Sequence, residues 1–547
     1  MSKQRVFSRD ATGFVRQIAP HQAFIYNLMA VGLVGFTEAV VFGYGPAVLP
    51  GADVGLSILT VIIAGIPFYA AVAMLACSMP RAGGDYVWQS RILHPMIGFG
   101  ATFSAWTVWQ WFFAAFLGTV MVTLGFQPFF ALLGQTTGNS SYVTLGANLA
   151  LPNTIFVITT LILVLGLIIT SIGVRFYVKL QYILFAGALL SVLAMIALLV
   201  TSSHQNFIDA FNGYMSTVIG PNAYQNVTQT AASSGIPLNP PFDLGGTITL
   251  WAIVWLSMGY AFWSIYNSGE IKNADNVKLQ LFQIVGSYFV IGLIWAITWY
   301  AYANTVGLDF IRAMNGLWFS ANPGPVNALL GVVPNPFFPY IVSLLTTNPM
   351  VYGIILLGAV LGYFQVVIIV YFASTRILMA SSIDRVLPEK IGYVNSRTSA
   401  PLVALIISFI GSEIWLYFVT YQFTAIGSYV ASAGFGTEIA YLLLCLTAIL
   451  FPYRMKRVYE ASPIAKYKVG NVPLVSIAGL LGLIFNLYLT YEYVAGPNLF
   501  LTYPLPQSDA FVIGLFVVCL LIYPISLAIR RAKGLDVSLA FKEIPPE

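Results

Sequence analysis

The stretch NLMAVGLVGFTE, residues 27–38, decides the fold of this chain. It lies inside an apolar run long enough to cross a membrane, yet it carries Gly32 and Gly35 near the centre of that run. Glycine destabilises a helix interior by about 1 kcal/mol relative to alanine. Backbone that leaves the helix within a bilayer is tolerated only where it lines a cavity or is buried in protein. The stretch therefore predicts either an interrupted helix beside a cavity or close helix packing through small residues.

A second stretch of this kind, WLSMGYAFW at residues 255–263, lies in the sixth apolar run and places Gly259 among polar and aromatic residues. The two stretches occupy the first helix of each of two five-helix sets. Because five is an odd number, the second set is inserted upside down relative to the first. Transporters built from inverted repeats have discontinuous helices of this kind at the bilayer midplane. The paired positions favour interrupted helices over packing alone.

The composition excludes a soluble protein. Of the 547 residues, 59% are hydrophobic and 8% are charged, and the mean hydropathy is +0.84. Soluble proteins carry about 25% charged residues because their surface faces water. Most of the surface of this chain must instead contact a lipid bilayer. We predict an all-α polytopic membrane protein.

The sequence shows no signature of a metal centre, a cofactor or an enzyme. The three cysteines, Cys77, Cys445 and Cys519, all lie in apolar runs, and the three histidines lie near the ends of such runs or in loops. This placement does not fit a disulfide framework or a metal site. No catalytic triad or phosphate-binding spacing is present either. We expect neither cofactor nor metal, and no enzymatic activity.

Counting apolar runs of about 20 residues or more gives about twelve spans, arranged as two sets of five followed by two further helices. The predicted spans are 22–47, 55–79, 97–125, 153–174, 178–202, 247–268, 279–306, 349–378, 401–420, 425–451, 473–495 and 509–530.

The loops between these spans alternate in charge. On one side they are rich in Lys and Arg, whereas on the other side Arg312 is the only basic residue. The positive-inside rule then places both termini in the cytoplasm, in a protein of the cell membrane. The net charge of +5 is a topology signal, and no nucleic-acid partner is expected. The predicted organisation is a cytoplasmic segment 1–21, a first repeat 22–202, an extracellular loop 203–246, a second repeat 247–451, a cytoplasmic loop with two helices 452–530, and a cytoplasmic tail 531–547.

Four motifs lie in order on the predicted cytoplasmic side: MPRAGGDY at 79–86, GEIKNA at 269–274, a segment from STRILMA through DRVLP to Pro401 within 374–401, and FPYR at 451–454. Together they resemble the amino acid–polyamine–organocation transporter superfamily, in its amino acid permease branch. The resemblance spans nearly the whole chain. Ala274 departs from the pattern, because a proline usually stands there.

The resemblance implies a site formed by the two interrupted helices. Free backbone N–H groups of the first helix would bind a substrate carboxylate, and backbone carbonyls of the sixth would receive its ammonium group. Carried over to this sequence, the substrate-binding residues are Gly32, Leu33, Val34, Gly35, Ser257, Met258, Gly259 and Tyr260. Trp255 matches an aromatic gate, with ordinary core packing as the alternative. Many relatives have an acid two residues after the glycine, but Ala261 stands here, which favours neutral amino acids.

The coupling ion is predicted from buried polar residues. Residues 350–372 of the eighth span contain no Ser or Thr, so a sodium site there lacks its hydroxyl ligands. Glu38 lies one turn beyond the first interruption, and we predict that it carries a proton together with the substrate. A static hydrogen bond that holds the outer half-helix is the alternative. Of the other acids within spans, we expect Glu438 to line the outer path and Glu413 to be peripheral.

Four charged residues, Asp85, Glu270, Lys272 and Arg376, are predicted to form a cytoplasmic gate through ion pairs. Solvated charges that only set the topology are the alternative. The sequence thus predicts proton-coupled amino acid symport. An ion-independent exchanger, a transporter of another organic amine, and a non-transporting scaffold or sensor subunit remain as alternatives.

Overall fold

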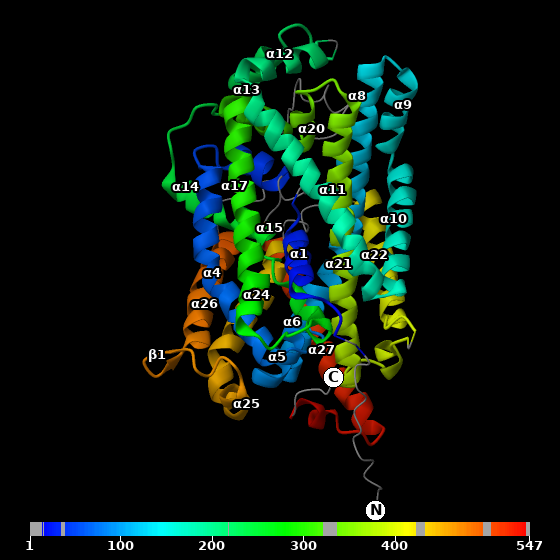
Figure 1. The fold of residues 1–547 in the computed structure, drawn as a ribbon, viewed down its shortest axis with the longest axis vertical. Coiled ribbons are helices and arrows are strands. Elements are labelled where there is room, and N and C mark those ends of the chain that lie inside the picture. Colours follow the sequence, from blue (N-terminus) through cyan, green and yellow to red (C-terminus); the bar gives the residue numbers. More distant parts are fainter. Residues whose placement is uncertain are drawn as a thin grey trace, which may run out of the picture.

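The protein is a bundle of long helices in a computed structural model that describes residues 14, 16–33, 39–216, 218–320, 336–395, 397–422, 433–495 and 505–542 (Figure 1). Within these ranges, eleven helices are long and apolar enough to cross a membrane. The only sheet among the described residues is a short hairpin of β1 (Lys468–Val469) and β2 (Val472–Pro473). The prediction of an all-α polytopic membrane protein is confirmed.

The helices follow the predicted spans closely; labels with η mark 3₁₀ or π helices. The first half contains α1 (Pro20–Val31), η1 (Ala39–Tyr44), α3 (Gly45–Val48), α4 (Val54–Ser78), α5 (Asp85–Ile92), α6 (Pro95–Phe103), η2 (Ser104–Val108), α7 (Trp109–Val120), η3 (Met121–Phe126), α8 (Gln127–Thr137), α9 (Ser140–Leu149), α10 (Pro152–Ile172) and α11 (Val174–Thr201). The middle contains α12 (His204–Met215), α13 (Ala223–Ser233), α14 (Leu244–Thr249), α15 (Trp251–Met258), η4 (Trp263–Glu270), α16 (Val277–Leu281), η5 (Phe282–Gly286), α17 (Ser287–Val306), α18 (Leu308–Trp318) and α20 (Phe338–Ser343). The remainder contains α21 (Pro349–Ile383), η6 (Glu389–Gly392), α22 (Leu402–Tyr421), α24 (Ala433–Arg454), α25 (Lys456–Ala461), α26 (Leu474–Ala495), α27 (Leu505–Ala532) and η7 (Val537–Phe541).

The first predicted span, 22–47, is interrupted near its centre. Helix α1 ends at Val31, and Gly32 follows with φ 89°, in a region that side chains with a Cβ rarely adopt. The next helix among the described residues, η1, begins at Ala39. Residues 34–38, which include the predicted site residues Val34, Gly35 and Glu38, lie outside the described residues.

The sixth span is interrupted at residues 259–262. Helix α15 ends at Met258, a turn follows, and the chain continues as the 3₁₀ helix η4. Gly259 has an ordinary helical φ of −63°, so its backbone conformation does not require glycine. Glycine is instead required by the limited space, because a Cβ at this position would lie 2.7 Å from the hydroxyl oxygen of Tyr441.

The segment expected to be a long extracellular loop, 203–246, contains the helices α12 and α13. Their aromatic side chains pack on α18, with ring centroids 4.4 Å apart for Tyr224 and Phe310 and 4.9 Å apart for Phe211 and Phe310. The segment as a whole is polar, so its sequence did not predict these helices. Their aromatic residues are buried by packing against Phe310 of α18. Helices α12 and α13 cap one end of the bundle, opposite α5 and α25 (Figure 1). We call these the outer and the inner end, after the predicted orientation.

Candidate substrate site and inner gate

A buried asparagine joins the inner halves of the two interrupted helices. The Asn27 side-chain oxygen in α1 accepts a hydrogen bond from the backbone N–H of Ser264 in η4, at 2.7 Å. Its amide nitrogen donates to the carbonyl of Gln283 at 2.9 Å. Asn27 is fully buried, so both bonds form away from water, where an unpaired amide would be costly. The first, sixth and seventh spans are thereby held together next to the interruptions.

The carbonyl groups at the interruption of the sixth span are hydrogen-bonded to hydroxyl groups. The hydroxyl of Tyr69 in α4 donates to the Met258 carbonyl, and that of Tyr441 in α24 donates to the Gly259 carbonyl at 2.8 Å. Ser287 donates to the Ala261 carbonyl at 3.3 Å. A carbonyl oxygen has two lone pairs and can accept a second donor. Neither tyrosine was predicted, because a tyrosine within an apolar span carries no signal of its partner.

The predicted contacts Ser257, Tyr260 and Leu33 are brought to the same interior. All three are buried, and the Ser257 and Tyr260 hydroxyls have no hydrogen-bond partner in the part of the chain that the structure describes. Polar groups that are buried without a partner are rare in folded proteins. A polar ligand at this position would supply the missing hydrogen bonds.

Trp255 is packed within an aromatic cluster. Its ring centroid lies 5.5 Å from that of Phe68, 5.6 Å from that of Tyr69 and 5.9 Å from that of Tyr441. Only 1% of the residue is exposed. This geometry is the core packing that was the alternative to a gate, and the gating role of Trp255 stays a prediction.

Two of the four predicted gate residues form a buried ion pair at the inner end. The Arg376 Nη2 and Nε atoms lie 2.8 and 3.0 Å from Oε1 of Glu270, and both side chains are buried. The Glu270 carbonyl also accepts the backbone N–H groups of Gln17 and Ile18, each at 2.8 Å. The segment before α1, the end of η4 and α21 are thus tied together, and this pair is not a set of solvated surface charges.

The other two predicted gate residues lie apart from that pair. Asp85, at the start of α5, accepts hydrogen bonds from Trp106 Nε1 at 2.9 Å and from Gln89 Nε2 at 3.2 Å. Burial raises the pKa of Asp85 to about 7, and the hydrogen bond from Trp106 opposes that shift. The Lys272 side chain is exposed, and its backbone N–H donates to the Ile18 carbonyl at 2.9 Å.

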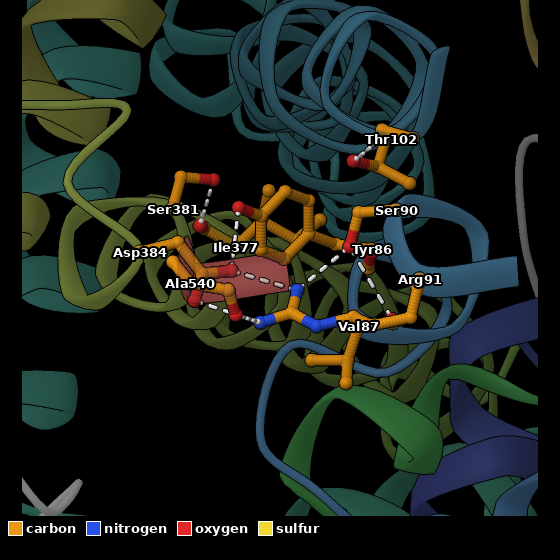
Figure 2. Close-up of polar contacts among 10 residues, drawn as sticks. Tyr86, Val87, Ser90, Arg91, Thr102, Ile377, Ser381, Asp384 and Ala540 are labelled. Atoms are coloured by element: carbon orange, nitrogen blue, oxygen red, sulfur yellow. Dashed lines mark hydrogen bonds and ion pairs between the residues drawn. The ribbon is translucent and has the colours of Figure 1, made fainter. Parts of the chain in front are cut away.

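A second buried ion pair at the inner end was not predicted as a site. Arg91 of α5 forms two contacts of 2.7 Å with the carboxylate of Asp384, which follows α21 (Figure 2). The Tyr86 hydroxyl donates to the same carboxylate at 2.9 Å, and Arg91 also donates to the Ala540 carbonyl in η7 at 3.5 Å. The guanidinium carbon lies 5.0 Å from the centre of the Phe541 ring. In the sequence, Arg91 is indistinguishable from the cations that set the topology.

The geometry now defines a class of protein. An all-α bundle that crosses the membrane many times, with its first and sixth spans interrupted around buried polar groups, is a membrane transporter. The sequence pattern of the amino acid permease family matches residues 22–522, and the chain belongs to that family. It is therefore a transporter of amino acids and not an enzyme.

One solved structure supports the fold independently. The crystal structure of MhsT in complex with L-phenylalanine aligns with a TM-score of 0.55 and 14% sequence identity. The alignment covers 89% of this chain and 100% of MhsT. At this identity the likeness concerns the fold alone. No protein in the curated set matches the sequence.

Proposed function

We propose that this protein is a secondary active transporter that moves neutral amino acids across the cell membrane by proton-coupled symport and alternating access. The observation that carries the proposal is the paired interruption of the first and sixth spans, at Gly32 and at residues 259–262. Backbone N–H groups at the start of a helix attract a carboxylate. The carbonyls at the sixth-span interruption each accept one hydroxyl and keep a second lone pair for an ammonium group, so the two interruptions suit the groups common to all amino acids.

The surroundings of the sixth-span interruption support an apolar, uncharged substrate. Ala261 is fully buried where many relatives carry an acid. Phe262 follows Ala261 in the chain, and its ring centroid lies 5.9 Å from that of Trp106. The Trp106 ring centroid lies 6.4 Å from that of Tyr260. Aromatic walls favour apolar side chains through burial of their surface. MhsT was solved with L-phenylalanine bound, which makes that amino acid a sensible first ligand to test.

For the coupling ion we propose a proton, with Glu38 as a carrier. Its position in the sequence, one turn beyond the first interruption, puts it beside the substrate. Ionisable residues within membrane spans are rare and mark ion pathways and proton relays. The inner gate is proposed to consist of the Glu270–Arg376 pair, which must separate when the site opens inward. Both termini are proposed to be cytoplasmic.

The test is transport by the purified protein in proteoliposomes. A thermal-shift screen of the twenty amino acids at two pH values, L-phenylalanine included, first identifies a ligand. The wild type is then expected to show counterflow without gradients and uphill accumulation when a pH gradient is imposed. Counterflow without pH-driven accumulation would instead identify an ion-independent exchanger. Absence of binding and of counterflow for every amino acid would contradict the proposed function.

Glu38→Gln tests the proton carrier. This variant is expected to keep counterflow and to lose pH-driven accumulation, because glutamine cannot release a proton. Accumulation equal to that of the wild type would remove Glu38 as the carrier and favour the static hydrogen bond.

A further inference from the structure

Glu438 is an acid in the interior of the bundle without a partner. It lies in the second turn of α24, is 0% exposed, and neither of its carboxylate oxygens has a hydrogen-bond partner among the described residues. Other acids in the bundle differ. Glu270 pairs with Arg376, and Glu413 is half-buried and accepts a hydrogen bond from Thr160 at 2.9 Å.

The ionisable groups that face Glu438 are three tyrosines and one cysteine. They come from the interruption of the sixth span (Tyr260), from α24 itself (Tyr441 and Cys445) and from α26 (Tyr493). Two of these hydroxyls are aimed elsewhere: Tyr441 donates to the Gly259 carbonyl at 2.8 Å, and Tyr493 donates to the Ala252 carbonyl at 2.6 Å. No Lys, Arg or His in the described part of the chain forms an ion pair with Glu438.

These surroundings determine the charge of Glu438. An ionised carboxylate without cation or hydrogen-bond donor is strongly destabilised in a buried, apolar site, and the group takes up a proton instead. Glu438 is therefore neutral in the arrangement seen here. It becomes ionised only when water or a cation reaches it.

Glu438 is also connected to the substrate site. Tyr441 follows it by one turn on the same helix and holds the Gly259 carbonyl, while Tyr260 belongs to the interruption itself. The Tyr260 hydroxyl is buried and has no hydrogen-bond partner within the described residues, like the carboxyl group that it faces. A charge on Glu438 would therefore act directly on the interrupted segment that is proposed to bind the substrate.

We propose that Glu438 is a proton-binding residue of the transport cycle. An oxygen of its carboxylate binds a proton from water while the site is open to the outside, and the O–H bond persists while the site is closed. The bond breaks when water enters from the inner side and accepts the proton. This proposal rests on the proposed function, to which it adds a second protonatable residue, near the interruption of the sixth span.

The first test measures the proton directly. In infrared spectra of the purified full-length protein at neutral pH, the wild type is expected to show the carbonyl band of a protonated, buried carboxylic acid. This band shifts in D₂O. In Glu438→Gln it is expected to lose the intensity that Glu438 contributes, while the contribution of the partly protonated Asp85 remains. An unchanged carboxylic-acid band in the variant overturns the proposal.

The second test measures coupling in proteoliposomes with the amino acid found in the thermal-shift screen. Glu438→Gln, which imitates the neutral acid, is expected to keep counterflow and to lose pH-driven accumulation. Glu413→Gln is the matched control, because it makes the same chemical change in a half-buried acid of a neighbouring span, and its coupling is expected to equal that of the wild type. Glu438→Gln with full pH-driven accumulation overturns the proposal, while wild-type accumulation would still uphold the proposed function.

A third measurement needs only the wild type, in case Glu438→Gln fails to fold. Dicyclohexylcarbodiimide reacts with protonated carboxyl groups in apolar surroundings, and the modified residue can be located by mass spectrometry. Labelling of Glu438 is expected, because its carboxyl group is buried and has no partner among the described residues, whereas Glu270, which pairs with Arg376, is expected to stay unlabelled. Absence of labelling at Glu438 overturns the proposal.

Discussion

Asp85 is a single residue whose charge depends on the fold. It is fully buried at the start of α5, its Oδ2 accepts both hydrogen bonds, and its Oδ1 has no partner among the residues that the structure describes. Burial therefore raises the pKa of its carboxyl group from 3.8 to about 7. A raised pKa means that the folded protein binds the proton more tightly than the unfolded chain does.

The stability of the protein is expected to fall as the pH rises through this window. Below about pH 4 Asp85 is protonated in both states, whereas between about pH 4 and about 7 only the folded state keeps the proton. Above about pH 7 this proton no longer contributes to the free energy of unfolding, and the total decrease is on the order of a few kcal/mol. Asparagine at position 85 cannot ionise, so Asp85→Asn avoids this decrease in the free energy of unfolding. Its thermal midpoint in detergent is expected to exceed that of the wild type at pH 8 and to depend less on pH.

Asp209→Asn is the control for this measurement, because Asp209 is exposed on α12. Its midpoint is expected to follow that of the wild type across the pH range. If the curves of Asp85→Asn and the wild type run parallel, Asp85 does not hold the proton.

Some residues of the site can be predicted from the sequence, and others cannot. Gly32 stands out because glycine near the centre of a span destabilises a helix, and the structure places it at the end of α1 with a positive φ. Tyr69 and Tyr441 carry no comparable signal, since their hydroxyl partners lie 189 and 182 residues away in the chain. Their role depends on tertiary contacts alone.

At the level of elements, the inner ends of the interrupted helices are held by two kinds of contact. Ile18 and Ile271 form a parallel backbone bridge, and Glu270 pairs with Arg376 of α21. The backbone bridge sets the register between the segment before α1 and the segment after η4. The ion pair binds η4 to α21, which is not one of the two interrupted helices. If this pair is the proposed inner gate, opening of the inner end requires the ion pair to break.

Glu270→Gln is expected to open the inner end more often. Loss of one partner leaves the buried guanidinium of Arg376 uncompensated, at a cost of about 3–5 kcal/mol. If the substitution destabilises the closed state by about 1.4 kcal/mol more than it destabilises the open state, the ratio of open to closed protein rises about tenfold. The measurement uses Ser268→Cys, because Ser268 is fully buried in η4, and follows the rate of maleimide labelling with and without Glu270→Gln.

Lys272→Gln serves as the matched control in the same Ser268→Cys background. It also removes one charge two residues away, but the Lys272 side chain is exposed. Labelling is expected to stay at the rate of the parent. Equal rates in all three proteins would contradict a gating role for Glu270 and Arg376.

For the molecule as a whole, the distribution of charge predicts the orientation. The loops rich in Lys and Arg alternate along the chain with loops in which Arg312 is the only such residue. Helices α5 and α25 lie at one end of the bundle, while α12 and α13 lie at the opposite end (Figure 1). A cysteine at Asp209 in α12 is expected to react with an impermeant maleimide in intact cells. A cysteine at Lys390 in η6 is expected to react only after permeabilisation, because both positions are exposed but lie at opposite ends. The native cysteines are buried and are not expected to react. The opposite labelling pattern would show that the predicted orientation is wrong.

The order of the spans could be predicted, and about twelve were expected where the described residues contain eleven, because an apolar run of about 20 residues has few other places to fold. The helices α12 and α13 could not, because their apolar residues make sense only against Phe310 of α18, 99 residues after Phe211. The same holds for Arg91, whose partner Asp384 lies 293 residues further along. Long-range pairing, and not local pattern, separates what the sequence predicts from what it does not.

The contact between Arg91 and η7 has a consequence for how the protein is made. The Ala540 carbonyl that caps Arg91 is translated 449 residues after it (Figure 2). Throughout membrane insertion the guanidinium therefore lacks both this cap and, for most of that time, the Asp384 carboxylate. The inner end is completed only when synthesis has passed residue 540. A chain that ends between Asp384 and Ala540 would keep the ion pair of Arg91 and lack only its contacts with η7.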